Sequence, residues 1–198
     1  MFVKVCGLST AEDVTTALDA GADAVGFVLT PSPRQVDPDA ARLLAALVPQ
    51  SVPAVGVFRH EDIADAAAAA YAAGLRWIQL HGERTRDEVE GLQRRGFKVI
   101  RAVTMADPSE SFEDRGEDLL LVDAAVPGSG EAWDYASVKD KGVAGRQWLL
   151  AGGLDDSNVA LAASTAGAWG VDVSSGVESS RGVKDPEKIT AFVTAAKA

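Results

Sequence analysis

The sequence predicts an α/β protein of one domain, a closed (β/α)8 TIM barrel that spans residues 1–198. Eight short apolar runs recur along the chain at intervals of 20 to 29 residues. Between them lie stretches with helical periodicity, several of which end in a glycine just before the next run. Strand–helix alternation at this spacing is typical of right-handed βαβ units, and eight such units can close a barrel.

The eight apolar runs are the expected strands of the barrel. They are rich in Val, Ile, Phe and Trp, as buried parallel strands are. An open doubly wound sheet is the alternative, but the G-x-G-x-x-G pattern typical of that fold is absent after the first run. The expected strands cover residues 2–6, 24–29, 53–58, 77–82, 97–103, 119–124, 148–153 and 169–175.

Helix boundaries are marked between these runs. Ser9–Glu12 and Thr85–Glu88 have the spacing of a capping box, and Asp37–Pro38 is typical of an N-cap followed by proline at the first helical position. The alanine stretch 66–70 predicts a helix packed closely on the sheet. Glycines expected to end helices in the left-handed conformation are Gly21, Gly74, Gly96 and Gly167.

Charge and cysteine content exclude several classes of partner. The chain has 19 Lys and Arg against 29 Asp and Glu, a formal net charge of −10. Nucleic acids and anionic membranes repel such a protein, so neither is expected as a partner, and no obligate protein partner is evident. A single cysteine cannot form an internal disulfide, and the N-terminus lacks the features of a signal peptide. A cytoplasmic protein is therefore expected.

Polar side chains gather where the expected strands end, which in such barrels is the active-site face. Cys6 ends the first strand and Asp123 ends the apolar part of the sixth. Gln79 and His81 are two residues apart and share one face of the fourth strand. The other candidates are Arg34 after the second strand, Gly152 and Gly153 after the seventh, and Asp172, Ser174 and Ser175 at the eighth.

Taken together, these residues predict a phosphorylated substrate that carries a carboxylate and undergoes proton transfer. Glycine-containing loops after the last two strands can hold a phosphate through backbone N–H groups. Arg34 can hold a carboxylate by a two-point fork, while Asp123 and Cys6 are a potential acid and base. Taken singly, Cys6 is equally well a buried hydrophobe and Asp123 a cap for the following turn. No metal is expected, because no His, Cys and carboxylate set has ligand spacing.

The motifs "KVCGL", "SPR", "VGVF", "QLHG", "PGSGEAWDY", "LAGGLDDSNV" and "GVDVSSGVES" occur here in order. In order and spacing this set resembles phosphoribosylanthranilate isomerases, which catalyse an Amadori rearrangement in tryptophan biosynthesis without a cofactor. The resemblance implies that Cys6 is the general base and Asp123 the general acid. It further implies that Arg34 holds the anthranilate carboxylate. The remaining implied contacts are Asp172, Gln79 and His81 for the substrate, and Gly152, Gly153, Ser174 and Ser175 for its phosphate.

The implied chemistry sets requirements on the acid and the base. As an acid, Asp123 needs a raised pKa, and Cys6 as a thiolate would be helped by a lowered one. Lys4 is a candidate source of positive potential for the thiol, with either Asp172 or Asp123 as its own partner. The loop after the sixth strand departs from the family pattern. Glu131 stands where a basic residue is common, and Pro127–Gly128 replaces a pair of glycines.

Two alternatives remain open. One is the related Amadori isomerase of histidine biosynthesis, or a bifunctional enzyme acting on both substrates. Those barrels carry an aspartate at the position of Cys6 and use two phosphate-binding halves, whereas phosphate-loop signatures appear here only in the second half. The other is a non-catalytic barrel that binds a phosphorylated ligand.

Overall fold

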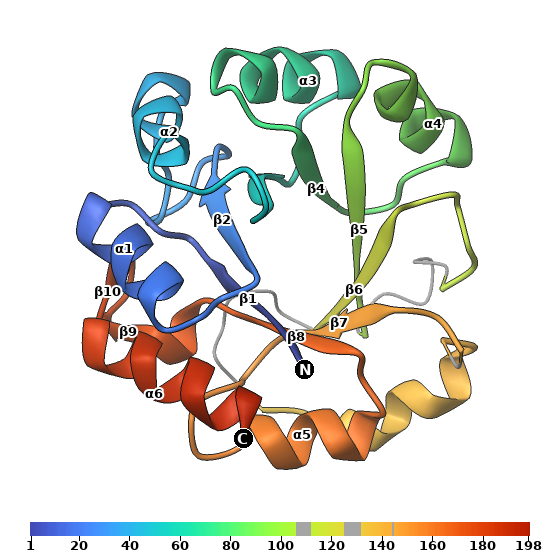
Figure 1. Ribbon diagram of the computed structural model, residues 1–198. Helices are drawn as coiled ribbons and strands as arrows, with labels where there is room; N and C mark the ends of the chain where they lie inside the picture. The colour runs from blue at the N-terminus through green and yellow to red at the C-terminus, as the bar shows by residue number, and fades with distance from the viewer. Residues whose placement is uncertain (106–111, 125–131, 144) are drawn as a thin grey trace.

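The computed structural model describes residues 1–105, 112–124, 132–143 and 145–198. Eight parallel strands form a closed barrel in the order β1 to β8, with the helices outside it (Figure 1). Each strand begins within one residue of its expected start, and the pairing of β1 with β8 closes the sheet, which confirms the predicted barrel over the open sheet. The strands are β1 Phe2–Cys6, β2 Ala24–Val28, β3 Ala54–Phe58, β4 Trp77–His81, β5 Lys98–Thr104, β6 Leu119–Asp123, β7 Trp148–Leu150 and β8 Gly170–Val173.

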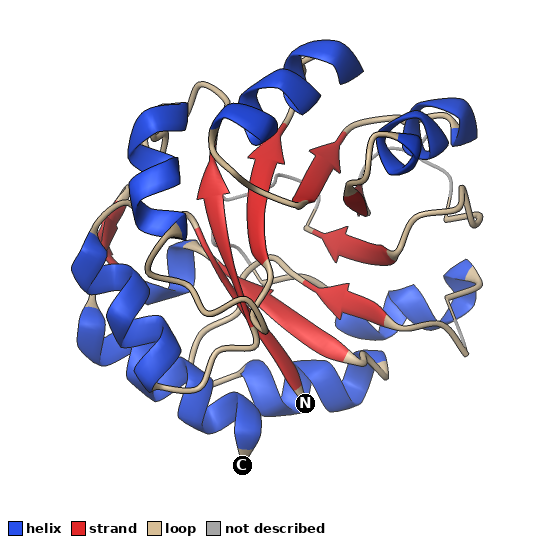
Figure 2. Cartoon of the chain, turned by 45° about the horizontal axis from the view of Figure 1, so that its top comes forward, coloured by secondary structure: helices blue, strands red, loops and turns tan. Residues whose placement is uncertain are grey.

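Helices surround the strands on the outside of the barrel (Figure 2). After β6 the chain forms the 3₁₀ helix η1 (Tyr135–Lys141), and a short 3₁₀ turn, η2 (Ser175–Val177), follows β8. A small antiparallel hairpin, β9 (Glu178–Ser180) with β10 (Val183–Lys184), was not expected from the sequence. The α-helices are α1 Ala11–Asp19, α2 Pro38–Ala45, α3 Ile63–Ala72, α4 Arg86–Arg94, α5 Val159–Ala166 and α6 Pro186–Lys197.

Most of the expected helix boundaries are confirmed. Thr85 and Glu88 form the capping box of α4, and Asp37 caps α2 with Pro38 at its start. The box expected at Ser9–Glu12 is wrong by one residue. Thr10 is the N-cap of α1, where its hydroxyl accepts the Asp13 N–H at 3.1 Å and the Asp13 carboxylate accepts the Thr10 N–H at 3.0 Å.

The glycine and alanine signals are confirmed as well. Gly21, Gly74, Gly96 and Gly167 have φ angles of 93°, 69°, 88° and 72° directly after their helices, where a side chain would be strained. In α3, Ala66 and Ala70 are fully buried in the core that lies between helices and strands. Small side chains there let the helix approach the barrel wall closely.

The inner side of the barrel carries apolar layers from Val55, Ile100, Ala102, Leu119, Leu121 and Leu149, with Phe2 and Trp77 packed against them. Because side chains alternate across a strand, every second residue of each strand faces this interior. Two residues beyond Leu121 the same face reaches Asp123, and two beyond Trp77 it reaches Gln79. The apolar layers thus continue into a polar layer at the carboxyl ends of the strands.

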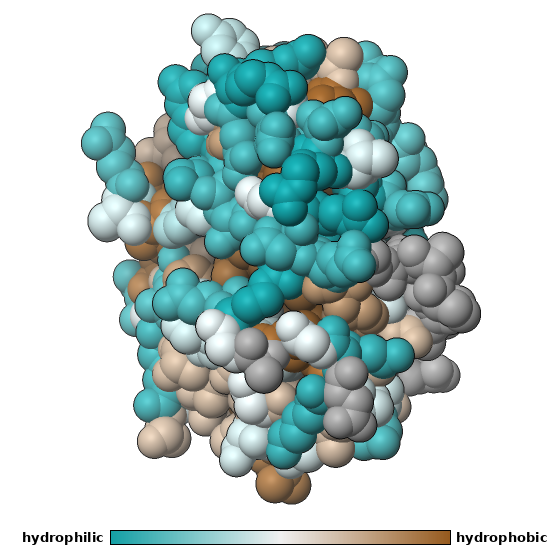
Figure 3. All heavy atoms as spheres, turned by 90° about the vertical axis from the view of Figure 1, so that its right-hand side faces the viewer, coloured by the Kyte–Doolittle hydropathy of each residue, from teal (hydrophilic) through white to brown (hydrophobic). Residues whose placement is uncertain are grey.

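The outer surface over α4 is covered largely by hydrophilic side chains (Figure 3). On this helix Glu90 lies 3.9 Å from Arg86 and 3.5 Å from Arg94, in the i,i+4 pairing that supports exposed helices weakly. Among the residues that the structure describes, no helix has the length and apolarity needed to cross a bilayer.

Candidate active site

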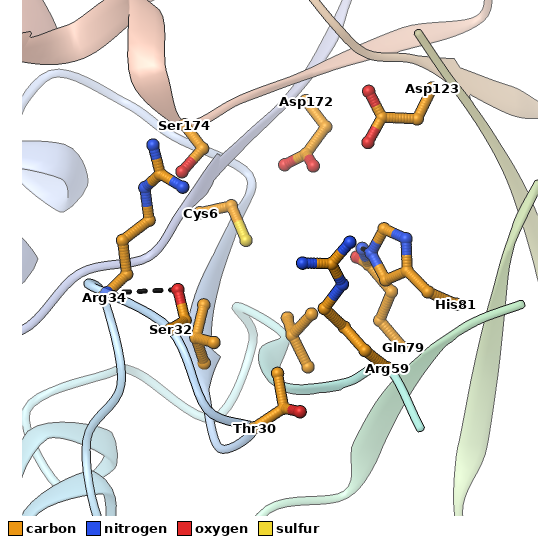
Figure 4. A pocket seen from close by; sticks show the side chains of 12 residues that line it. Cys6, Thr30, Ser32, Arg34, Arg59, Gln79, His81, Asp123, Asp172 and Ser174 are labelled. Atoms are coloured by element: carbon orange, nitrogen blue, oxygen red, sulfur yellow. Dashed lines mark hydrogen bonds between the residues drawn. The ribbon is translucent and has the colours of Figure 1, made fainter. Parts of the chain in front are cut away.

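A pocket opens at the carboxyl ends of the strands, and most of the candidate residues line it (Figure 4). The expected residues Cys6, Arg34, Gln79, His81, Asp123, Asp172 and Ser174 are all in its wall, although they come from five different parts of the chain. An adjoining cavity is lined by Gly152, Gly153 and Ser175 together with Asp123, Asp172 and Ser174. The sequence-predicted set therefore forms one continuous site.

The Cys6 thiol is buried at the end of β1, beside Val28 and Val57. Gly26 on β2 pairs with Cys6 in register, and a Cβ at Gly26 would lie 2.9 Å from the sulfur. The glycine therefore leaves the space that the thiol occupies. Burial raises the pKa of Cys6, and the nearby charge of Lys4 offsets only part of this effect.

The pairing of Lys4 explains why the pKa of the Cys6 thiol is raised, although a lowered pKa would help a thiolate base. The Lys4 ammonium group is fully buried and donates a hydrogen bond to the Asp172 carboxylate at 2.9 Å. Of the two partners considered from the sequence, Asp172 is therefore the one it meets. An ammonium so closely paired has much of its field cancelled at the neighbouring sulfur, so burial dominates.

Asp123 is buried at the end of β6, where its Oδ1 accepts the Ala124 N–H at 2.8 Å. Burial, the largest influence, raises the pKa of Asp123 to about 7, although the Ala124 N–H acts in the opposite direction. The Asp172 carboxylate raises it further. This carboxyl group is therefore partly protonated at neutral pH, as a general acid must be.

Gln79 and His81 contact each other inside the pocket. The Gln79 Nε2 lies 2.9 Å from the His81 Nε2, so the amide donates and the imidazole nitrogen accepts. Burial and the nearby Arg59 lower the pKa of His81 to about 3, which leaves the ring neutral with its proton on Nδ1. That Nδ1 and the Gln79 Oε1 are buried without a hydrogen-bond partner among the described residues.

Arg34 lies in the pocket wall, but part of its guanidinium is already engaged. Its Nε and Nη2 donate to the two oxygens of Glu178 at 2.6 and 3.0 Å. The Lys184 ammonium donates to the same carboxylate at 2.9 Å and to the Ser174 carbonyl at 2.7 Å. Burial opposes ionisation of Glu178, yet the hydrogen bonds from Arg34, the Gly182 N–H and Lys184 lower its pKa to about 2. The hairpin thereby holds the loop after β2 against the end of β8.

Replacing Glu178 by Gln is expected to destabilise the protein by about 3 kcal/mol, because it leaves the buried Lys184 and the partly buried Arg34 without their anion. Urea denaturation at neutral pH measures the change. Since the folded-state pKa of Glu178 is depressed to about 2, its stabilisation is present above its ordinary value of 4.5 and is lost as the pH falls toward 2. The difference in the free energy of unfolding between wild type and Glu178→Gln should therefore decrease as the pH falls from 4.5 toward 2. Glu187→Gln, at an exposed position of α6, is the matched control and should change stability little.

The glycines of the phosphate-loop candidates are required by backbone shape. Gly152 has a φ of 85°, and a Cβ there would lie 2.5 Å from the Ala124 Cβ. At Gly176 a Cβ would lie 1.8 Å from the Leu154 carbonyl oxygen, so the loops after β7 and β8 can approach only with glycine. Trp133 and Tyr135 fix the first of these loops by donating to the carbonyls of Ala151 and Gly152, both at 3.1 Å.

Several residues at or beside the pocket were not among those predicted from the sequence. Glu178 and Lys184 gave no signal, because the hairpin that brings them to Arg34 could not be foreseen. Arg59 stands at the exit of the third expected strand, and this position could have identified it from the sequence. Glu131 and Pro127–Gly128, the departures noted in the loop after the sixth strand, lie outside the described residues.

Comparison with known proteins gives a consistent result. Residues 3–195 match the family model of N-(5'-phosphoribosyl)anthranilate isomerase. A protein of that name from Paracoccus denitrificans is 45% identical over 213 residues, covering 99% of this chain and 97% of its own. The solved structure of TrpF from Jonesia denitrificans is 46% identical, with a TM-score of 0.87 over 100% of this chain and 97% of that one. A solved phosphoribosyl anthranilate isomerase in complex with reduced 1-(o-carboxyphenylamino)-1-deoxyribulose 5-phosphate has a TM-score of 0.85 and 32% identity, over 100% and 98% of the two chains.

Proposed function

This chain belongs to the N-(5'-phosphoribosyl)anthranilate isomerase family, and we propose that Cys6 and Asp123 are the base and acid with which it catalyses the family reaction. That reaction is the Amadori rearrangement of phosphoribosylanthranilate to 1-(2-carboxyphenylamino)-1-deoxyribulose 5-phosphate, a step of tryptophan biosynthesis. The observation that carries the assignment is the shared pocket. Cys6 on β1 and Asp123 on β6 line one mouth that continues into the glycine loops after β7 and β8.

In the first step Asp123 donates its proton to the ring oxygen of the ribose as the bond between that oxygen and C1′ breaks. The electron pair of the substrate nitrogen forms a double bond to C1′, which gives a protonated imine. A carboxyl group with a pKa of about 7 suits this role, because a useful fraction remains protonated at neutral pH. After this transfer Asp123 is a carboxylate.

In the second step the Cys6 thiolate removes the proton from C2′, and the C–H electron pair moves toward C1′ to give an enolamine. Proton transfer from the C2′ hydroxyl to C1′ then gives the ketone. Because the pKa of Cys6 is raised in the free site, only a minor fraction of the enzyme carries the thiolate. A return of the Cys6 proton to Asp123, directly or through water, restores the starting state.

The two anionic ends of the substrate are assigned to opposite sides of the mouth. The phosphate fits the loops of Gly152, Gly153, Ser174 and Ser175, where backbone N–H groups and hydroxyls can donate. The anthranilate end then lies toward β2, β3 and β4, where Arg34 can offer the carboxylate its remaining donors. Gln79, His81 and Asp172 face the sugar between these ends. Holding both ends fixes the sugar between the acid and the base.

The two pKa values predict an unusual pH profile. Activity needs protonated Asp123 and ionised Cys6. Below pH 7 Asp123 is protonated, so kcat/KM should rise about tenfold per pH unit with the thiolate fraction. Above pH 7 the gain in thiolate is cancelled by loss of the Asp123 proton, so the profile should flatten, and it should fall only above the pKa of Cys6. Steady-state kinetics between about pH 6 and 10 measures this.

A control variant tests whether the change of slope near pH 7 comes from Asp123. The substrate phosphate also titrates near pH 6 and can add curvature. In Asp123→Asn, the pH profile of the residual activity should keep any change of slope due to the phosphate but lose the change near pH 7. The residual activity should then rise with pH up to the pKa of Cys6. An identical bend in both proteins would show that Asp123 is not its source.

Turnover of phosphoribosylanthranilate, followed by the loss of its fluorescence, is the test of the activity. An active wild type and an inactive Cys6→Ala variant are the expected results. Full inactivity of the wild type would favour a barrel that only binds its ligand, and turnover of the histidine-pathway substrate would establish a bifunctional enzyme. The site acts on a small phosphorylated molecule, and the one cysteine, a free thiol, supports a role in the reducing cytoplasm.

A further inference from the structure

Arg59 stands directly after β3 and faces the mouth of the barrel. Val55 belongs to the apolar interior and Val57 packs beside Cys6, so the next residue on this face is Arg59. Its side chain lines the same pocket as the acid and the base. Figure 4 shows the guanidinium directed into the pocket, on the side of Gln79 and His81. After burial, the charge of Arg59 is the largest cause of the lowered pKa of His81, which also places the charge close to that ring.

The guanidinium of Arg59 has no anionic partner among the described residues. The backbone N–H of Arg59 donates to Glu61 and its carbonyl accepts from Arg84, but within the described ranges no hydrogen bond or ion pair involves its side chain. The other cations near the mouth differ in this respect. Lys4 is paired with Asp172, and Arg34 donates two of its five N–H groups to Glu178. In a chain with a net charge of −10, a cation left unpaired at the site is a place for an anion of the ligand.

From this arrangement we propose that Arg59, together with Arg34, binds the carboxylate on the aromatic ring of the substrate and selects ligands that carry it over ligands that lack it. The inference rests on the proposed function, because that function supplies a ligand with two anionic ends. The phosphate loops follow β7 and β8, and in a closed ring of eight strands β3 lies across the mouth from β7. A ligand anchored there by its phosphate directs its far end toward β2 and β3, where Arg34 and Arg59 stand.

The partner is an aromatic carboxylate, which a guanidinium recognises by charge, by a two-point fork and by stacking. Because Arg59 is exposed at the rim, its charge is partly screened by solvent and salt. We therefore expect a contribution of about tenfold in affinity, with a visible dependence on ionic strength. An arginine that only serves solubility would show no dependence on the ligand carboxylate.

The experiment measures binding of two ligands by calorimetry. The first is reduced 1-(o-carboxyphenylamino)-1-deoxyribulose 5-phosphate, and the second is the same compound without the ring carboxylate. Arg59→Met should weaken binding of the first about tenfold and leave binding of the second within about twofold. Arg59→Lys, which keeps the charge and loses the fork, should lie between. Arg42→Met, at an exposed position of α2, changes the net charge equally and should leave both affinities unchanged.

Several outcomes would overturn the proposal. An equal loss of affinity for both ligands in Arg59→Met, or no loss for either, would show that Arg59 does not bind the carboxylate. The same conclusion would follow if the preference for the ligand with the carboxylate vanished in Arg34→Met but persisted in Arg59→Met. Circular dichroism and the melting temperature of each variant exclude misfolding as the cause. A wild type that isomerises phosphoribosylanthranilate while Arg59 fails these tests would leave the proposed function standing. A wild type that neither binds nor isomerises would remove both.

Discussion

Replacing Asp123 by Asn should reduce kcat about 10³-fold or more while the affinity for the reduced product analogue changes little. The amide is nearly the same size as the carboxyl group and can still accept the Ala124 N–H, but it has no acidic proton for the ring oxygen. The loss should therefore appear in kcat, with KM nearly unchanged. Fluorescence turnover and calorimetry on the same preparation separate the two effects.

The same variant should not be destabilised at alkaline pH, which separates a chemical role from a structural one. The pKa of Asp123 is raised in the folded state from 3.8 to about 7, so the stability linked to this group is present at low pH and is lost as the pH rises through 7. Asn carries no charge at any pH. At pH 8 the melting temperature of Asp123→Asn should thus equal or exceed that of wild type. A variant that is both inactive and much less stable would point to a structural role instead.

Replacing Cys6 by Ser is the second change with a large expected effect, again a loss of about 10³-fold in kcat. Serine fits the space that Gly26 leaves open, but its hydroxyl gives up a proton far less readily than a thiol does. The ring can still open in this variant, because Asp123 is intact. The step that fails is removal of the C2′ proton.

Substrate deuterated at C2′ identifies that step. In Cys6→Ser the isotope effect on kcat should be large, because the proton removal has become rate-limiting, and binding of the product analogue should stay within about twofold of wild type. Full activity of Cys6→Ser, or of Cys6→Ala, would exclude the thiol as the base.

How far the sequence predicts this molecule depends on the range of the interactions involved. The strands and most helix ends follow from local signals, namely apolar runs, capping residues and glycines such as Gly21 and Gly167. The candidate site was predictable because a barrel brings all its strand ends to one rim, so that Cys6 and Asp123 line one pocket although 117 positions separate them. At the start of α1 the sequence fits a capping box that ends at Glu12 or one that ends at Asp13, and only the structure shows that Asp13 forms it.

Electrostatic details were not predictable, because they depend on which charges end up paired. The sequence left Lys4 with two possible partners, and its pairing with Asp172 is what leaves the Cys6 pKa raised by burial. Arg34 was expected to hold the substrate carboxylate by a two-point fork, but the hairpin after β8 brings Glu178 to two of its donors. Arg59 shows the reverse case, a residue that resembles a surface charge in the sequence and lies in the mouth.

The most direct measurement of the central assignment is a crystal structure with reduced 1-(o-carboxyphenylamino)-1-deoxyribulose 5-phosphate bound. We expect the Cys6 sulfur within about 4 Å of C2′ and the Asp123 carboxyl within about 3.2 Å of the sugar oxygen that derives from the ring, with the phosphate on the amides after β7 and β8. A ligand whose sugar touches only one of the two groups, or whose phosphate lies elsewhere, would contradict the assignment.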